Sequence, residues 1–267
     1  MLKEKITKTV LRYPGGKFRA AKTIINLMPK TTTKLCSPFL GGGSIELACA
    51  RNNIKVFGYD IFSPLIEFWQ CLMSNPVKLA NIVEKYHPLS KSKFYNLQKT
   101  QNKSKSKYER AGIFYVLNRS SFSGSTLSGG MSPGHARFNK AAINRIRSFR
   151  IENFTVQKLD FRDSLPKHQD AFVYLDPPYM IAHKLYGVKG NTHKNFDHEE
   201  LAKILKNRDN WILSYNNSES VHKLYSEYTF YYPDWKYGMS SEKKSSEVLI
   251  LSHDIAKYNK DLGKLDI

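Results

Sequence analysis

The chain has 267 residues, 41% of them hydrophobic, which is enough to bury a full core in one α/β domain with an insertion or in two small domains. No apolar run reaches the roughly 18 residues of a membrane helix, and the charged start has no signal-peptide pattern. We therefore expect a cytoplasmic or nuclear protein that is not secreted and has no membrane partner. The net charge of +19 indicates a polyanionic partner instead.

The cysteines and histidines are too scattered for a disulfide framework or a zinc site. Cys36, Cys49 and Cys71 lie far apart in the sequence, and none belongs to a Cys-x-x-Cys pair. The eight histidines show no zinc-type spacing. We expect no metal ion.

A tight turn is predicted near the start of the chain. Residues 11–17 read Leu-Arg-Tyr-Pro-Gly-Gly-Lys, and the two glycines allow the backbone to approach a ligand closely. Tyr13 and Lys17 flank them, and this pair suits a purine ring and a carboxylate. A basic helix is expected over residues 18–28.

A glycine-rich loop follows the first predicted strand. Residues 34–44 indicate a strand and then the loop Pro-Phe-Leu-Gly-Gly-Gly-Ser, with Ser44 as the expected N-cap of the next helix. A second strand, residues 54–59, ends in Asp60, nineteen residues after Gly41. This layout is typical of Rossmann-type sheets, in which the loop backbone and the acid hold an adenosine.

The loop departs from the dinucleotide-binding pattern at one position. Gly41 and Gly43 fit the first two glycines, but Glu46 stands where the third is needed and would crowd a pyrophosphate. An adenosine cofactor without phosphates fits better. The alternative is a glycine turn that serves packing alone.

The positive charge is concentrated in the middle of the chain. Two amphipathic helices, 64–73 and 76–86, lead into residues 90–150, which contain thirteen Lys or Arg and one acid, Glu109. This segment carries +12 of the total charge, and such a concentration favours a nucleic-acid surface over an ordinary solvated face.

The basic segment also contains a long loop. A lysine- and serine-rich stretch, residues 91–107, precedes an apolar helix at 108–118, and a helix at 140–149 closes the segment. The loop between these helices, residues 119–131, is long enough to indicate a function. Its hydroxyl side chains and Phe122 suit contacts with base edges and phosphates.

The second half of the chain predicts the rest of the sheet. Residues 180–196 are a candidate lid, and a capped helix is expected at 197–207. The expected strands are residues 154–158, 171–175, 211–214, 228–232 and 247–251, and the last two form an antiparallel pair around a basic loop at 236–244.

The tetrapeptide Asp-Pro-Pro-Tyr follows the buried strand 171–175. Asp176 and Tyr179 are joined by two prolines, which fix two φ angles and remove two backbone donors. A carboxylate, two carbonyls and an aromatic ring are thus presented at the edge of the sheet where ligands bind. A simple strand-ending turn is the alternative.

These pieces together suit methyl transfer to an amino group of a base. Asp176 and the carbonyl of Pro177 are two acceptors for the hydrogens of an exocyclic amine, and Tyr179 can stack on the ring. The target base must be flipped out of the duplex to reach such a pocket. For an adenosine cofactor without a pyrophosphate, the economical choice is S-adenosylmethionine.

In these motifs the chain resembles the alpha-class DNA N6-adenine methyltransferases, the Dam-like family. The matching elements keep the family's order along the chain, and they are residues 12–17, 38–44, Asp60, Asp160-Phe161 and the Asp-Pro-Pro-Tyr of 176–179. Leu117-Asn118-Arg119, with Phe122 and Gly124, is similar to the start of the family's target-recognition hairpin. Tyr13 replaces the usual tryptophan, and residues 123–127 lack the polar and arginine residues of GATC-specific relatives.

The resemblance implies an α/β fold with a Rossmann-like, mostly parallel sheet and a helical and loop insertion for target recognition. The catalytic and cofactor domain would comprise residues 1–75 and 151–267, and the recognition domain residues 76–150. The partner would be double-stranded DNA, bound by a monomer or a weak dimer. The implied catalytic residues are Asp176, Pro177 and Tyr179, the cofactor residues are Tyr13, Lys17, Phe39, Gly41, Gly43, Asp60, Asp160, Phe161 and Asp176, and the DNA-contacting residues are Arg119, Ser121, Phe122, Ser123, Ser125, Arg137 and Arg145.

Two other interpretations remain open on the sequence. The first is N4-cytosine, RNA or protein-glutamine methylation, since these reactions also act on planar amines. The second is a DNA-binding protein that kept the fold and lost catalysis. The intact Asp176, Tyr179, Gly41, Gly43 and Asp60 argue against the second.

Overall fold

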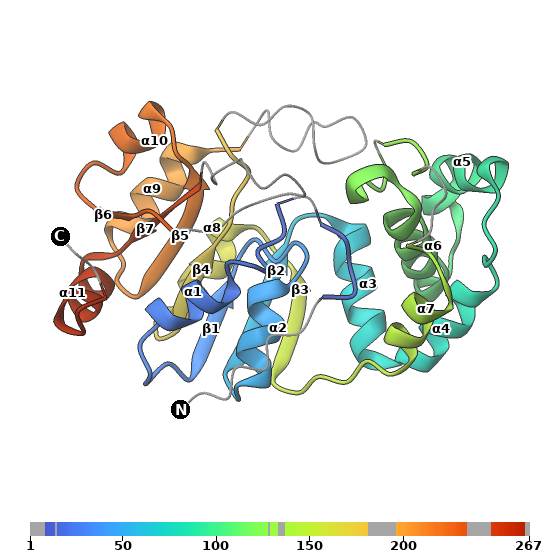
Figure 1. Cartoon of the computed structure of the whole chain (residues 1–267), viewed down its shortest axis with the longest axis horizontal. Helices are drawn as coiled ribbons and strands as arrows, with labels where there is room; N and C mark the ends of the chain where they lie inside the picture. The colour runs from blue at the N-terminus through green and yellow to red at the C-terminus, as the bar shows by residue number, and fades with distance from the viewer. Residues whose placement is uncertain are drawn as a thin grey trace.

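The computed structural model describes residues 9–13, 15–127, 129–132, 137–180, 196–233 and 247–264. Within these ranges seven strands form one sheet, in the order β3-β2-β1-β4-β5-β7-β6 (Figure 1). The neighbouring pairs from β3 to β5 are parallel, whereas β7 runs antiparallel to both β5 and β6. The strands are β1 (Lys34–Ser37), β2 (Lys55–Asp60), β3 (Phe154–Lys158), β4 (Phe172–Leu175), β5 (Trp211–Asn216), β6 (Thr229–Tyr231) and β7 (Glu247–Leu251).

The sequence predicted each of these strands to within two residues at either end, and the antiparallel pairing of β6 with β7 is confirmed. The predicted fold class, a mostly parallel α/β sheet of the methyltransferase type, is also confirmed. The proposed lid and the basic loop at 236–244 fall almost entirely outside the described residues. No helix in the described part of the chain is long and apolar enough to cross a membrane.

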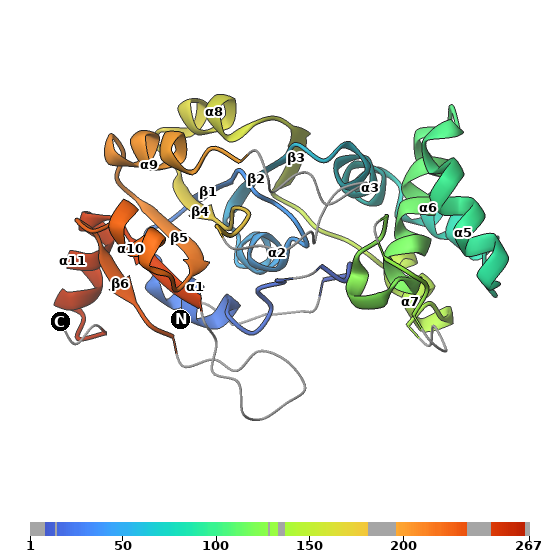
Figure 2. The ribbon, with the colours of Figure 1, turned by 90° about the horizontal axis from the view of Figure 1, so that it is seen from above.

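Helices cover both faces of the sheet, because successive strand residues point to opposite sides. In β5, for example, Ile212 belongs to one buried cluster and Leu213 to the other. The first cluster lies under α1 (Ala21–Leu27), α2 (Ser44–Arg51) and α11 (His253–Asp261). The second lies under α8 (Phe161–Ser164), α9 (His198–Lys206) and α10 (Glu219–Leu224). Figure 2 shows α1 and α2 on one side of the sheet and α8 and α9 on the other.

The remaining helices form a group beside the β3 edge of the sheet (Figures 1 and 2). These are α3 (Ser63–Ser74), α4 (Pro76–Glu84), α5 (Lys91–Thr100), α6 (Lys107–Ser120) and α7 (Lys140–Arg147). The rings of Phe68 in α3 and Tyr115 in α6 stack at 5.5 Å, and Arg110 pairs with Glu67 at 2.5 Å. The first buried cluster continues through α3 into this group, so the helical part shares its core with the sheet.

Two predicted boundaries in the helical part differ from the structure. Helix α6 runs to Ser120, two residues beyond its predicted end. The expected loop 119–131 is therefore shorter, and it closes on itself through a bridge between Ser121 and Met131, which the 3-10 turn Phe122–Gly124 directly follows. The hydrogen bond from the Phe122 N–H to the Gly130 carbonyl, 2.9 Å long, supports this closure.

Candidate active site

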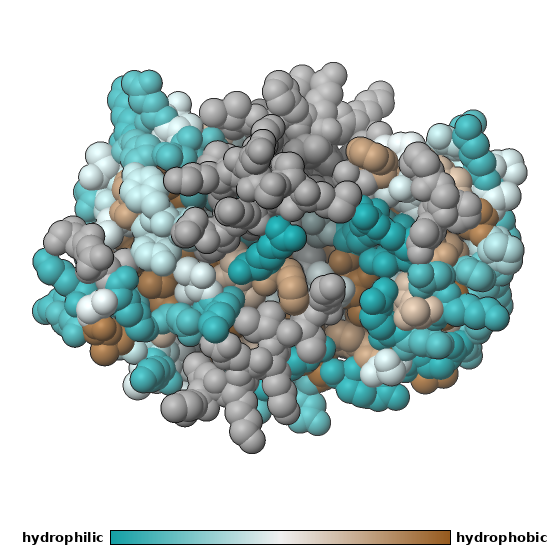
Figure 3. All heavy atoms as spheres, in the orientation of Figure 1, coloured by the Kyte–Doolittle hydropathy of each residue, from teal (hydrophilic) through white to brown (hydrophobic). Residues whose placement is uncertain are grey.

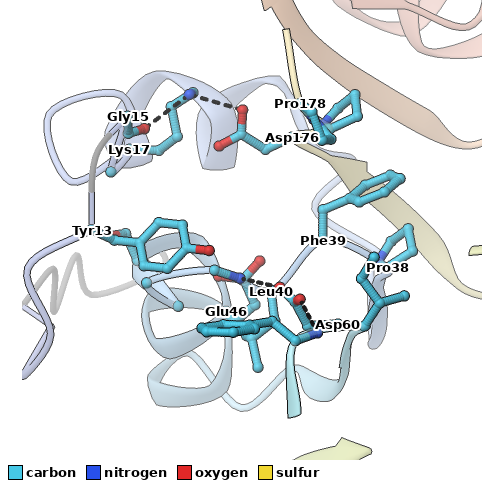
Figure 4. Close-up of a pocket in the computed structure, with 18 of the residues that line it drawn as sticks. Tyr13, Gly15, Lys17, Pro38, Phe39, Leu40, Glu46, Asp60, Asp176 and Pro178 are labelled. Carbon is cyan, nitrogen blue, oxygen red and sulfur yellow. Dashed lines mark hydrogen bonds and ion pairs between the residues drawn. The ribbon is translucent and has the colours of Figure 1, made fainter. Parts of the chain in front are cut away.

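A cavity of ≈ 240 Å³ lies at the carboxyl edge of the parallel strands. It is the edge at which open α/β sheets bind their ligands. Every residue predicted for catalysis or for the cofactor lines this cavity, namely Tyr13, Lys17, Phe39, Gly41, Gly43, Asp60, Asp160, Phe161, Asp176, Pro177 and Tyr179. Figure 4 shows Lys17 and Asp176 joined at one end of the cavity and Asp60 at the opposite end. The structure therefore brings residues from all five separate sequence elements to one place.

The glycine loop owes its shape to a backbone that only glycine adopts easily. Gly43 has φ +68°, and a Cβ placed there would come within 2.7 Å of the Trp69 ring. The predicted N-cap is consequently wrong by one residue. Gly43, in a left-handed conformation, caps α2, and Ser44 begins the helix. Ser44 lines the cavity, and its buried hydroxyl finds no hydrogen-bond partner among the described residues.

Asp60 holds the glycine loop from the end of β2. Its carboxylate accepts hydrogen bonds from the N–H groups of Gly41, at 3.2 Å, and Phe62, at 2.9 Å. Burial raises the pKa of Asp60 to about 6, although these two bonds act in the opposite direction. An ionised carboxylate has about four acceptor positions, and the Ile61 N–H also acts on this one, so about one position remains for a hydroxyl group of a ligand.

Lys17 is buried at the other end of the cavity, with 3% of its side chain exposed. Its ammonium pairs with Asp176 Oδ1 at 2.9 Å and Glu247 Oε1 at 3.3 Å, and it donates to the Tyr179 hydroxyl at 2.9 Å and the Gly15 carbonyl at 3.0 Å. Burial alone would lower the pKa of Lys17. The Asp176 carboxylate and the other oxygens around the ammonium outweigh burial and raise the pKa well above its usual range.

Asp176 follows directly after β4 and shares the Lys17 ammonium. Burial raises the pKa of Asp176 to about 6, the ion pair with Lys17 lowers it, and the nearby charge of Glu247 raises it. One carboxylate oxygen is engaged by Lys17. The neighbours of Asp176 therefore determine at which pH its carboxyl group is ionised and can accept hydrogen bonds.

Sequence reasoning did not assign a site role to Glu46, which lines the cavity, or to Glu247, which contacts two of the lining residues. Glu46 was predicted only to crowd a phosphate; it lines the cavity with 2% exposure and accepts a 2.5 Å hydrogen bond from the Ser37 hydroxyl. Burial raises the pKa of Glu46 to about 7 in spite of that bond. Glu247 begins β7 and reaches both Lys17 and Tyr179. The sequence did contain one signal for Glu247, because an acidic residue begins a predicted apolar strand.

Three rings form an aromatic wall of the cavity. The Phe39 centroid lies 5.8 Å from that of Phe161 and 5.5 Å from that of Phe196, and Phe161 and Phe196 lie 5.4 Å apart. Such a wall suits a flat heterocycle. Phe196 was not predicted as a site residue, since it ends the segment that the sequence indicated as a lid.

The described residues contain no group of three or more His, Cys, Asp or Glu side chains able to hold a metal ion. Sequence comparison decides among the reactions that this cavity could support. The chain matches the family model described as D12 class N6 adenine-specific DNA methyltransferase over residues 13–239. The protein belongs to this family. Its reaction is therefore the methylation of adenine in DNA, and it needs a methyl donor.

Several named relatives agree with this assignment. A type II methyltransferase, M1.LlaDCHI of Lactococcus lactis subsp. cremoris, is 24% identical over 82% of this chain and 85% of its own length. The DNA adenine methylase of Escherichia coli K12 is 26% identical over 66% of each chain. The modification methylase StsI of Streptococcus sanguinis is 24% identical over 96% of this chain, which spans 44% of that longer protein.

In this D12 methyltransferase one buried amide joins the backbone of Arg12 to the loop 121–131. The Asn118 side chain, fully buried in α6, accepts from the Arg12 N–H at 2.9 Å and donates to the Arg12 carbonyl at 2.7 Å. The same amide donates to the Thr126 hydroxyl at 3.2 Å. Gly124 fits beside Arg12 only because it lacks a Cβ, which would meet the Arg12 carbonyl at 2.4 Å. Asn118 thus holds a segment that lies 106 positions earlier in the chain.

Replacing Asn118 by alanine should lower the free energy of unfolding of the D12 methyltransferase by about 3 kcal/mol, because buried backbone groups of Arg12 and the Thr126 hydroxyl would lose their partners. Urea denaturation followed by circular dichroism measures the change. Asn96→Ala, an exposed position of α5, is the control and should be neutral. An unchanged midpoint for Asn118→Ala would show that the contacts of Asn118 do not stabilise the fold.

The residues predicted to contact DNA do not all face solvent. Arg119 is 9% exposed and donates twice to the Arg137 carbonyl, at 3.0 and 2.9 Å, while Ser121 is buried. Phe122 is 63% exposed, and Arg137 and Arg145 are exposed. Ser125 lines the cavity, and the side chain of Ser123 lies outside the described structure. Figure 3 shows hydrophilic residues over much of the helical part on one face.

Proposed function

We propose that the protein transfers a methyl group from S-adenosylmethionine to N6 of an adenine that has been flipped out of duplex DNA. The observation that carries this proposal is that Asp176 and Tyr179 open into the same cavity as the glycine loop and Asp60. A site for an adenosine and a site for a planar amine are then adjacent. The transferred group has a short path between them.

The residues present fit this cofactor. The aromatic wall suits the adenine, the remaining acceptor position of Asp60 suits a ribose hydroxyl, and Lys17 suits the amino-acid carboxylate. The partnerless Ser44 hydroxyl offers a further contact. When bound, S-adenosylmethionine supplies an electrophilic methyl group on its sulfonium. Glu46 lines the cavity as a buried acid, and its carboxyl group would oppose a pyrophosphate, which favours a cofactor that has none.

Asp176 and Pro177 hold the amine of the target base. An exocyclic amine is a poor nucleophile because its lone pair is delocalised into the ring, and acceptors that bind its hydrogens favour a tetrahedral nitrogen. The Asp176 carboxylate and the Pro177 carbonyl are such acceptors, kept in place by the two prolines. As the nitrogen–methyl bond forms, the bond between the methyl group and the sulfonium sulfur would break and leave a neutral thioether. One N6 proton leaves and passes to solvent. Tyr179 presents its ring to the base while its hydroxyl is held by Lys17 and Glu247.

The helical part binds the DNA. Exposed Lys and Arg of α5 and α7 contact phosphates, which gives affinity without sequence information. The exposed Phe122 of the loop 121–131 contacts the bases, together with Arg137 and Arg145. Arg119 and Ser121 do not contact the DNA but stabilise the loop, through hydrogen bonds to the Arg137 carbonyl and from the Thr126 N–H. We assign this role to residues 76–150 and expect the protein to act as a monomer or weak dimer, since one subunit contains the whole cavity.

The rate should fall as the pH drops through about 6, because Asp176 must be ionised to accept the amine hydrogens and burial raises its pKa to about 6. If the carboxyl group had an ordinary pKa, the rate would not change with pH until the pH fell to about 4.5. Measuring kcat from pH 5 to 8 at saturating DNA and cofactor tests this. A flat profile down to pH 5 would contradict it.

The proposal is tested by incubating the purified protein with methyl-labelled S-adenosylmethionine and unmodified duplex DNA, followed by nucleoside analysis. N6-methyladenine is the expected product. Label on cytosine, or on RNA offered in parallel, would replace the proposal with the corresponding reaction. Cofactor binding without transfer to any substrate would indicate a DNA-binding relative that has lost catalysis.

A further inference from the structure

The antiparallel strand β7 brings its first residue to the catalytic edge of the sheet. Parallel strands deliver their last residues to that edge, whereas an antiparallel neighbour delivers its first. Glu247 pairs with Asn216 of β5 at the start of β7, and its side chain is 9% exposed. It therefore lies level with Asp176, which follows β4.

The contacts of Glu247 form a directed chain. The Lys17 ammonium donates to the Tyr179 hydroxyl at 2.9 Å, and that hydroxyl donates in turn to Glu247 Oε1. The same oxygen accepts from Lys17 at 3.3 Å. A phenol that both accepts and donates has a fixed hydroxyl direction, and its ring cannot swing away without breaking two bonds. The carboxylate also shares the Lys17 charge with Asp176.

We propose that Glu247 is a positioning residue for methyl transfer, which fixes the Tyr179 ring against the target base and the Lys17 ammonium beside Asp176. This inference rests on the proposed function. Glu247 does not touch the substrate; it acts through the two side chains that it holds. Its charge also opposes the ionisation of Asp176, so it sets the pH at which Asp176 becomes an acceptor.

Two substitutions separate these effects. Glu247→Ala removes the acceptor and the charge. We expect kcat to fall roughly 10–100-fold, the usual effect of losing a residue that orients a functional side chain. KM for the cofactor should stay near wild type. Glu247→Gln keeps an acceptor oxygen and should retain most of kcat. In both variants the acid limb of the kcat profile should move to lower pH, because the like charge next to Asp176 is gone.

Glu152→Ala, an exposed acid before β3, is the matched control and should leave kcat and its pH profile unchanged. A Tyr179→Phe substitution combined with Glu247→Gln should cost less than the sum of the single losses, since both act on one hydrogen bond. Wild-type kcat in Glu247→Ala, or a lower melting temperature with an unmoved acid limb in both variants, would overturn the inference. An inactive wild type would instead reject the proposed function itself, and with it the positioning role that depends on it.

Discussion

Asp176→Ala should abolish methyl transfer, with a loss of at least about 10³-fold in kcat, while the protein still binds duplex DNA. One preorganised hydrogen-bonding group at a reacting centre is worth about 10²–10³-fold. Asp176 also shares its charge with Lys17, so its loss disturbs a second cavity residue. The DNA surface on α5 and α7 lies on other elements and should be unaffected. Transfer is measured with labelled cofactor, and DNA binding by fluorescence anisotropy.

The control for Asp176→Ala is Asp261→Ala, which removes an exposed acid at the end of α11. It should leave both measurements unchanged. Asp176→Asn adds a second comparison, because the amide keeps one acceptor oxygen and should retain measurable transfer. Parallel loss of transfer and DNA binding in Asp176→Ala would show that Asp176 holds the fold rather than the amine.

Much of the site was predictable because its motifs are local in sequence. The prolines after Asp176 fix a turn wherever the strand ends, and Gly41, Gly43 and Asp60 follow the ordinary spacing of a strand, loop, helix and strand. Parallel strands then bring these ends to one edge. Local pattern and sheet topology are sufficient for that part of the cavity.

The missed features depend on pairings between distant segments. Asn118 clamps Arg12 across 106 positions, and nothing near either residue announces the contact. Glu247 reaches Lys17 and Tyr179 because β7 is antiparallel and lies between β5 and β6 in the sheet, an order that the sequence did not specify. Arg119 is buried because it donates to the Arg137 carbonyl. An arginine that the sequence suggested for phosphate contacts therefore stabilises the loop.

Lys17→Met should reduce methyl transfer by more than about 100-fold and should move the remaining activity to higher pH. The substitution keeps a side chain of similar length but removes the charge that Asp176 and Glu247 share at 2.9 and 3.3 Å. Two carboxylates would then face each other in a desolvated cavity without their cation, which is costly. The pKa of Asp176, already raised by burial and lowered in part by Lys17, should rise above about 6.

The direction of the pH shift makes this prediction specific. Losing Lys17 should move the acid limb up, whereas losing Glu247 should move it down, because one group favours the ionised form of Asp176 and the other opposes it. Lys260→Met, an exposed position of α11, is the control and should leave the profile in place. An acid limb that moves the same way in Lys17→Met and Glu247→Gln would mean that the two side chains do not act through the charge of Asp176. Opposite shifts would establish Lys17, Asp176 and Glu247 as one electrostatic unit, in which the protonation of the catalytic carboxyl is set from both sides.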